Sequence, residues 1–108
     1  MSAARGPEEA LRRAFVVLRT RGAGWDDARP LEEQAEWPAH AAFMDALAAE
    51  GLVAFAGPLE GTRDALIVFH AEDITEVLER LSADPWTLND LLVTKQYWPW
   101  QLRLGSLG

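Results

Sequence analysis

His40 is the residue of this sequence whose type and spacing most suggest chemistry. It shares one helical stripe, at i, i+3, i+4 and i+7, with three apolar residues, Phe43, Met44 and Leu47. A stripe of this composition faces a core, where an imidazole needs a polar partner. Asp84 is our candidate for that partner, because a carboxylate that holds one ring nitrogen leaves the other to act as a base or acid toward a small molecule.

Both residues also have structural interpretations, and the residues alone leave the choice open. His40 could be a partly buried histidine near the start of a helix, satisfied by a neighbouring polar group. Asp84 directly precedes Pro85, and an aspartate in that position is a good N-cap for the turn that follows.

The charge balance narrows the class of partner. Asp and Glu number 17 against 10 Lys and Arg, which gives a formal net charge of −7. Duplex DNA and anionic membranes select clustered basic residues, so we expect no nucleic-acid partner and no membrane partner. A small-molecule ligand is the better match to this composition.

Signals for a cofactor are missing from the sequence as well. It has 0 Cys, which excludes disulfides, thiolate chemistry and Cys-ligated metal sites. Its 2 His residues lack metal-binding spacing, and neither Gly22-Ala23-Gly24 nor Gly57-Pro58 matches a phosphate or dinucleotide loop. We therefore expect no metal and no cofactor.

A chain of 108 residues supports one hydrophobic core. Residues 1–13 hold Leu11 as their one sizeable apolar side chain, which predicts a flexible N-terminal tail before a single α+β domain over 14–108. The N-terminal segment lacks the apolar centre of a secretory signal, and the longest apolar run, Leu52–Leu59, is far shorter than the roughly 20 residues that span a bilayer. These features predict a cytoplasmic protein.

Hydrophobic periodicity and turn residues predict the elements that position His40 and Asp84. In chain order they are a strand over 14–20, a loop over 21–30 with Trp25 in need of cover, a helix from Pro38 to the stop at Gly51, a strand over 52–56 ended by a turn at Gly57-Pro58, a strand over 64–70, a helix capped by Asp73 and running to Leu81, and a strand over 91–104 in one or two pieces.

This order, β-α-β-β-α-β, is typical of the ferredoxin-like α+β fold, a four-stranded antiparallel sheet with two helices on one face. The first three strands are apolar on both sides, and two helices can cover only one of them. The surplus apolar face predicts a homodimer in which two sheets pack face to face. The alternative is that the N-terminal tail folds across that face.

Several short motifs together resemble the YciI-like (YCII-related) family of the dimeric α+β barrel superfamily. The resemblance runs from about Phe15 to Leu104 and rests on Trp37-Pro38-Ala39-His40-Ala41-Ala42-Phe43-Met44-Asp45-Ala46-Leu47 followed by Gly51, on Ala56-Gly57-Pro58-Leu59, on Asp84-Pro85-Trp86 and on Pro99-Trp100. It implies a ferredoxin-like protomer that dimerises through its sheet. It also implies an active-site dyad of His40 and Asp84, in a cleft whose wall Gly57 and Pro58 shape. The segment between the second and third strands, Leu59 to Arg63, is shorter than the family's insert.

With that topology, the tryptophans of the sequence fall into two groups. Trp25, Trp37 and Trp86 are expected to line the cleft around His40, whereas Trp98 and Trp100 are expected at the dimer edge, where aromatic residues anchor interfaces.

Two functions remain open at this point. One is a small-molecule acid/base enzyme of the lyase, isomerase or dehydrochlorinase type, and the other is a non-catalytic homodimeric module that binds a small ligand or regulates. Heme or monooxygenase-like chemistry, known in the same superfamily, would have His40 as its one clear ligand.

Overall fold

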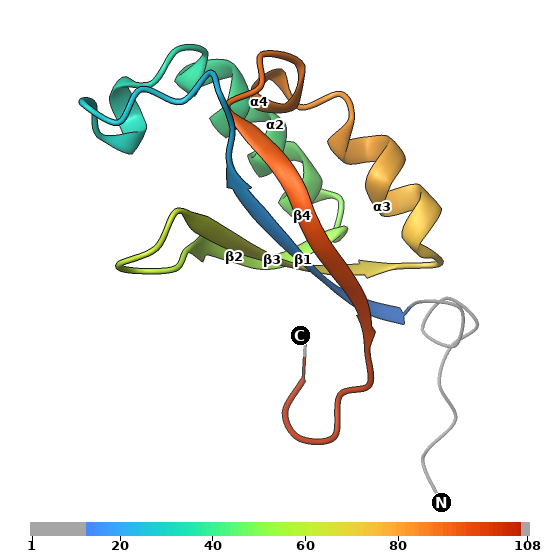
Figure 1. Cartoon of the computed structure of the whole chain (residues 1–108). Helices are drawn as coiled ribbons and strands as arrows, with labels where there is room; N and C mark the ends of the chain where they lie inside the picture. The colour runs from blue at the N-terminus through green and yellow to red at the C-terminus, as the bar shows by residue number, and fades with distance from the viewer. Residues whose placement is uncertain (1–12, 107–108) are drawn as a thin grey trace, which may run out of the picture.

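Four strands form one antiparallel sheet in the order β2-β3-β1-β4 (Figure 1). The computed structural model describes residues 13–106, so the predicted tail lies outside the described residues except for Arg13, which begins the first strand. The strands are β1 (Arg13–Arg21), β2 (Val53–Pro58), β3 (Asp64–Ala71) and β4 (Leu92–Trp100).

The helices gather on one side of this sheet, where α2 and α3 cover it (Figure 1). They are the 3-10 helix η1 (Leu31–Glu33), α2 (Trp37–Ala49), α3 (Ile74–Leu81) and the single-turn α4 (Pro85–Leu88). This architecture confirms the predicted ferredoxin-like α+β fold, with α4 as a short addition where only a polar turn was expected.

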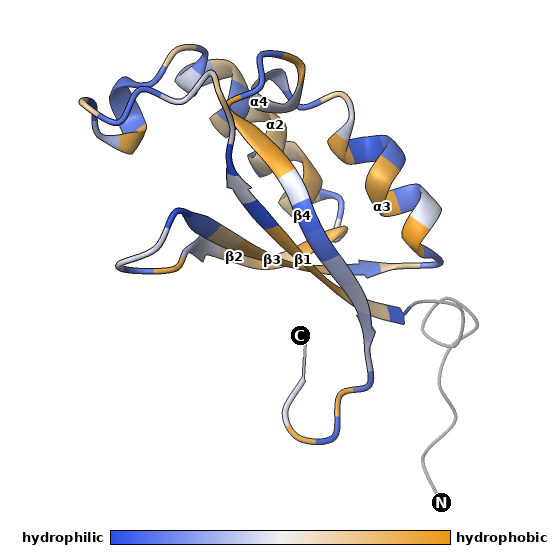
Figure 2. Ribbon diagram, in the orientation of Figure 1, coloured by the Kyte–Doolittle hydropathy of each residue, from blue (hydrophilic) through white to orange (hydrophobic). Residues whose placement is uncertain are grey.

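The two long helices begin and end where the sequence predicts. Pro38 lies in the first turn of α2, and Gly51 follows that helix with φ +83°, a left-handed conformation that glycine adopts without steric cost. The Asp73 side chain accepts a hydrogen bond from the Glu76 amide at 2.9 Å and so caps α3. Figure 2 shows α3 with alternating apolar and polar segments, as a helix packed on one side requires.

The main core lies between this sheet and these helices. Phe15 and Val17 of β1 pair with Phe69 and Ile67 of β3, and all of these side chains are buried. Leu47 of α2 is buried against them, with Phe43 and Met44 packed at the margin of the cluster. The predicted helical stripe therefore faces the core, and His40, which belongs to the stripe, lies on the same side of the helix.

Gly57-Pro58 does not form the predicted turn. Strand β2 continues through both residues, with Gly57 opposite Leu66 and Pro58 opposite Ala65. The prediction was wrong because Gly and Pro usually interrupt strands, whereas β2 lies at the edge of the sheet, where a proline can remain in the ladder.

Strand β4 is one strand with an irregularity. Its pairing with β1 shifts between Leu18, which faces Gln96, and Arg19, which faces Thr94, so Lys95 has no partner on β1. Beyond this bulge, Trp98 and Trp100 stand opposite Val16 and Ala14.

Candidate active site

Three side chains from distant parts of the chain form a hydrogen-bonded row. His40, in the first turn of α2, has its Nδ1 at 2.8 Å from Oδ1 of Asp84. The other oxygen, Oδ2, accepts a hydrogen bond from Nη1 of Arg19 at 3.0 Å. Asp84 is 0% exposed and Arg19 1% exposed, so the pair is shielded from water while His40 remains at the edge of solvent, at 12%.

Asp84 is also the N-cap of α4, because its Oδ1 accepts the amide hydrogen of Trp86 at 3.0 Å. Its structural role, predicted as an alternative to the functional one, is therefore present together with the contact to His40. One carboxylate orients both the imidazole and the helical turn that carries Trp86.

The hydrogen bonds around Asp84 favour its charged form. Burial of the carboxyl raises its pKa, and this is the largest single effect. The hydrogen bond from His40 acts in the opposite direction, and the net result is that the pKa of Asp84 lies below its ordinary value. The amide of Trp86 and the charges of His40 and Arg19 act in the same direction. An ionised carboxylate only accepts hydrogen bonds, so the proton shared with His40 belongs on Nδ1.

Arg19 is held by more than the carboxylate. Its Nη2 donates to Oγ1 of Thr87 at 2.6 Å and to the carbonyl oxygen of Leu92 at 2.9 Å. Burial lowers the pKa of Arg19, while the hydrogen bond and charge of Asp84 oppose that change. A guanidinium stays charged in proteins, so Arg19 supplies a fixed cation beneath the dyad.

The His40 ring is oriented by an aromatic stack as well as by Asp84. It lies on the Trp86 ring with centroids 3.8 Å apart and planes 6° apart. Trp86 is itself fixed, since its Nε1 donates to the carbonyl oxygen of Ala35 at 2.7 Å. Among the described residues, no group hydrogen-bonds to Nε2 of His40, which leaves this nitrogen for a ligand.

A cleft of about 260 Å³ lies beside this ring. Six residues predicted for the site line it: His40, Trp25, Trp37, Gly57, Pro58 and Trp86. Asp84, the seventh, lies behind the lining, where it hydrogen-bonds to His40, Arg19 and the amide of Trp86.

Two of the cleft tryptophans, Trp25 and Trp37, contact the third, Trp86. Trp25 meets Trp86 edge to face at 5.3 Å, and Trp37 lies 5.7 Å from the same ring. Trp25 lies in the long loop but is buried, as expected for a large aromatic side chain that needs to be covered by other residues. A wall of indoles is well suited to a flat, largely apolar ligand.

The sequence interpretation missed the arginines of the site. Arg19 was taken as part of an apolar strand, although it follows Phe15 and Val17 at the spacing that points to the helices. Arg21 and Arg63 also line the cleft. The alternation in β1 was the available signal for Arg19, because a cation on the covered face of a strand needs a buried partner.

Metal ligands are a separate question. Within residues 13–106, no group of three or more His, Cys, Asp or Glu side chains could hold a metal ion. The dyad has one imidazole and one carboxylate, whose other oxygen is occupied by Arg19.

Comparison with known proteins bears on these same residues. The family model of the YCII-related domain matches residues 18–101, a span that contains the dyad and the whole lining of the cleft. The chain belongs to the YCII-related family. No curated protein matches this family member in sequence.

A solved structure resembles this YCII-related chain in fold. It is 5-chloro-2-hydroxyhydroquinone dehydrochlorinase (TftG) from Burkholderia phenoliruptrix AC1100, in complex with 2,5-dihydroxybenzoquinone. The TM-score is 0.57 at 21% sequence identity, and the match covers 85% of this chain and 95% of that one. In the part of the YCII-related chain that the structure describes, no helix is long and apolar enough to cross a membrane.

Proposed function

We propose that this YCII-related protein is an acid/base enzyme that uses the His40–Asp84 dyad, without a cofactor, on a small planar molecule held in the tryptophan-lined cleft. The observation that carries the proposal is the orientation of His40. Asp84 holds Nδ1 at 2.8 Å and Trp86 stacks on the ring at 3.8 Å, which leaves Nε2 for the ligand.

Charge balance supports a base at Nε2. Arg19 pairs with Asp84 from the far side at 3.0 Å, so this buried carboxylate has a permanent cationic partner in addition to its hydrogen bond with His40. With Nδ1 protonated and bonded to Asp84, a neutral ring presents its lone pair at Nε2. That lone pair can take a proton from an O–H or an acidic C–H of the ligand.

Two reactions can follow from this proton transfer, an isomerisation and an elimination. The proton moves from the ligand to Nε2, and its electron pair stays on the ligand. In an isomerisation, His40 returns the proton to a different atom. In an elimination, the electron pair forms a new double bond and expels an anion such as chloride, and the proton on Nε2 is later lost to water.

The choice of probe compounds follows from the similar structure. The name of that protein, a dehydrochlorinase, describes an elimination, and its bound dihydroxybenzoquinone is a flat ring. The three indoles of the present cleft suit a ligand of that shape. At 21% identity the similarity carries the fold alone, so these compounds are a starting panel.

The test is a turnover assay with matched histidine variants. Chlorinated hydroquinones are incubated with the protein while chloride release and absorbance are followed. Turnover should fall by about 100-fold or more in His40→Gln, the range typical for loss of a general base. His70→Gln, which changes the other histidine outside the cleft lining, should retain it. Retained turnover in His40→Gln would refute the proposal, and binding without turnover by the wild type would favour the ligand-binding module.

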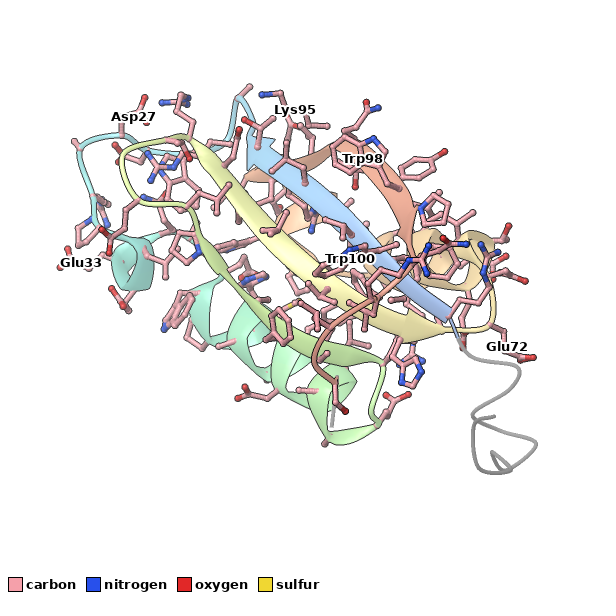
Figure 3. The ribbon with its side chains drawn as sticks, turned by 90° about the horizontal axis from the view of Figure 1, so that it is seen from below. Asp27, Glu33, Glu72, Lys95, Trp98 and Trp100 are labelled. Carbon is pink, nitrogen blue, oxygen red and sulfur yellow. The ribbon has the colours of Figure 1, made fainter. Side chains whose placement is uncertain are left out.

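We also propose that the protein is a homodimer through the uncovered face of the sheet. Large apolar side chains lie on that face, including Phe55, Trp98 and Trp100, which are 56%, 44% and 43% exposed. Figure 3 views this face from below and labels both tryptophans. A second copy of the sheet would bury them, and the resemblance noted in the sequence implies the same assembly.

Light scattering on the purified chain tests the dimer. The wild type should have the mass of two chains, and Trp98→Glu should shift it to one. Leu88→Glu introduces the same charge at an exposed apolar residue of α4, which lies among the helices, and should leave the dimer intact. A monomeric wild type at micromolar concentration would contradict the proposal.

A further inference from the structure

The lining of the cleft contains several arginines, in a chain whose net charge is −7. Three arginines line the cleft, Arg19, Arg21 and Arg63, and among the lining residues that the structure describes Asp64 is the one acidic residue. The pairing of these groups determines which charge is available to a ligand.

Two of the four charged groups are already balanced. Arg19 is paired with the buried carboxylate of Asp84 at 3.0 Å. Asp64 is paired with Nζ of Lys95, outside the lining, at 3.3 Å. Neither group therefore decides the sign of the charge at the mouth.

Arg21 and Arg63 share a single carboxylate. Nη1 of Arg63 lies 2.8 Å from Oδ1 of Asp27, and Nη1 of Arg21 lies 3.9 Å from the same oxygen. The backbone also brings the two residues together, since the amide of Arg21, at the end of β1, donates to the carbonyl oxygen of Arg63, just before β3, at 3.1 Å. Two guanidinium groups thus converge on one acceptor, which leaves an excess of one positive charge.

Arg21 is also fixed relative to the dyad. Its guanidinium carbon lies 4.6 Å from the centroid of the Trp25 ring, in a cation–π contact. Trp25 meets Trp86, which carries the stacked His40 ring. Arg21 follows Arg19 on the same face of β1, about 7 Å further along the strand. The cation and the imidazole are therefore separated by the indole wall.

We propose that the cleft selects a planar ring that carries a carboxylate, with Arg21 and Arg63 binding the carboxylate at the mouth. The ring lies along the indoles, and its other end faces Nε2 of His40. This assignment rests on the proposed function and makes ring carboxylates its preferred substrates over neutral rings. Guanidinium groups suit such a ligand because they bind carboxylates through charge-assisted, often bidentate hydrogen bonds.

A pair of probes that differ only in charge tests the assignment. Benzoate and benzamide have the same ring, and their binding to the wild type is measured by titration calorimetry and ligand-detected NMR. Benzoate should bind about tenfold more tightly, and its advantage should shrink as NaCl is raised, because these arginines are partly exposed. Arg21→Gln and Arg63→Gln should each lose most of the preference for benzoate while affinity for benzamide stays within about twofold.

Arg103→Gln is the matched control, because it removes one positive charge at an exposed position outside the cleft. It should leave both affinities unchanged. Equal binding of the two probes would overturn the carboxylate assignment and leave the ring-binding cleft standing. An equal loss of benzoate affinity in Arg103→Gln would overturn the assignment to Arg21 and Arg63. No binding of either probe would contradict both this inference and the aromatic cleft of the proposed function.

Discussion

Arg19 and Asp84 are 65 positions apart in the chain and meet at 3.0 Å, both out of contact with solvent. Removing one member of such a buried pair leaves the other charge without compensation, which is far more costly than removing an exposed pair. This relationship links the centre of the sheet to the turn that begins α4, so it contributes to stability and positions the dyad at once.

We expect Arg19→Leu to lower the free energy of unfolding by about 3–5 kcal/mol, because Asp84 would remain buried beside an apolar side chain. Urea denaturation followed by tryptophan fluorescence measures the loss. Arg80→Leu is the control, since Arg80 pairs with Glu50 at 2.7 Å on the exposed surface. Its effect should be much smaller. Equal losses in the two variants would show that burial of the Arg19 pair has no special weight.

Asp84 should make stability depend on pH below about pH 4. Its pKa is lower in the folded protein than the ordinary value of about 3.9, so its contribution is complete above that value and is lost as the pH falls through the folded pKa. The difference in unfolding free energy between the wild type and Asp84→Asn should therefore be largest near neutral pH and shrink toward pH 2. A difference that stays constant over this range would be inconsistent with a charged Asp84. The pH dependence that the other carboxylates contribute is the same in both proteins and therefore cancels in this difference.

The neutral imidazole of His40 should carry its proton on Nδ1, because an ionised Asp84 can only accept at 2.8 Å. Nitrogen-15 chemical shifts of the ring report the tautomer directly, without any substrate. His70 provides an internal reference, since its ring makes no hydrogen bond to the residues that the structure describes. A proton on Nε2 would remove the lone pair on which the proposed reaction depends.

Two glycines hold the loop that carries Trp25 against the end of α4. The amides of Gly22 and Gly24 donate to the carbonyl oxygens of Leu91 and Asp90, each at 2.8 Å. A Cβ at Gly22 would collide with the Asp90 carbonyl oxygen, and one at Gly24 with that of Asn89. We expect Gly22→Ala and Gly24→Ala each to cost about 1–3 kcal/mol in unfolding free energy.

Gly57→Ala is the control for these two variants, because a Cβ there meets nothing within 4 Å among the residues that the structure describes. Thermal or urea denaturation should find this variant close to the wild type. If all three alanine variants had equal stability, the close backbone approach at Gly22 and Gly24 would have no energetic importance.

Local patterns in the sequence placed the long helices and singled out His40 and Asp84, whereas their interpretation as a pair also needed the topology and the family resemblance. The apolar stripe through Phe43 and Leu47 determines which way His40 faces, and Asp84 follows from its position before a proline. Both signals are contained within a single element. The order of elements then brings the start of α2 and the end of α3 to the same side of the sheet.

The role of Arg19 could not be predicted in the same way, because its partners Asp84, Thr87 and the Leu92 carbonyl all come from the far end of the chain. One sequence contains no information on such pairings beyond the requirement that a buried cation have a partner. Pro58 was misassigned for a related reason. Whether a proline interrupts a strand depends on whether that strand lies at an edge, and the strand order is a property of the whole sheet.

The bulge at Lys95 interrupts the alternation of side chains along β4, so that even-numbered residues face the helices before it and the opposite side of the sheet after it. Side chains alternate along a regular strand, so even-numbered residues would normally share one face. Here Leu92 stands opposite Arg21 and lines the cleft, whereas Trp98 stands opposite Val16 on the uncovered face. One unpaired residue thus divides the strand into two segments that can evolve separately. A substitution at Trp98 would therefore change the uncovered face without altering the cleft wall at Leu92, and loss of Lys95 would leave a regular strand in which both side chains keep their present faces.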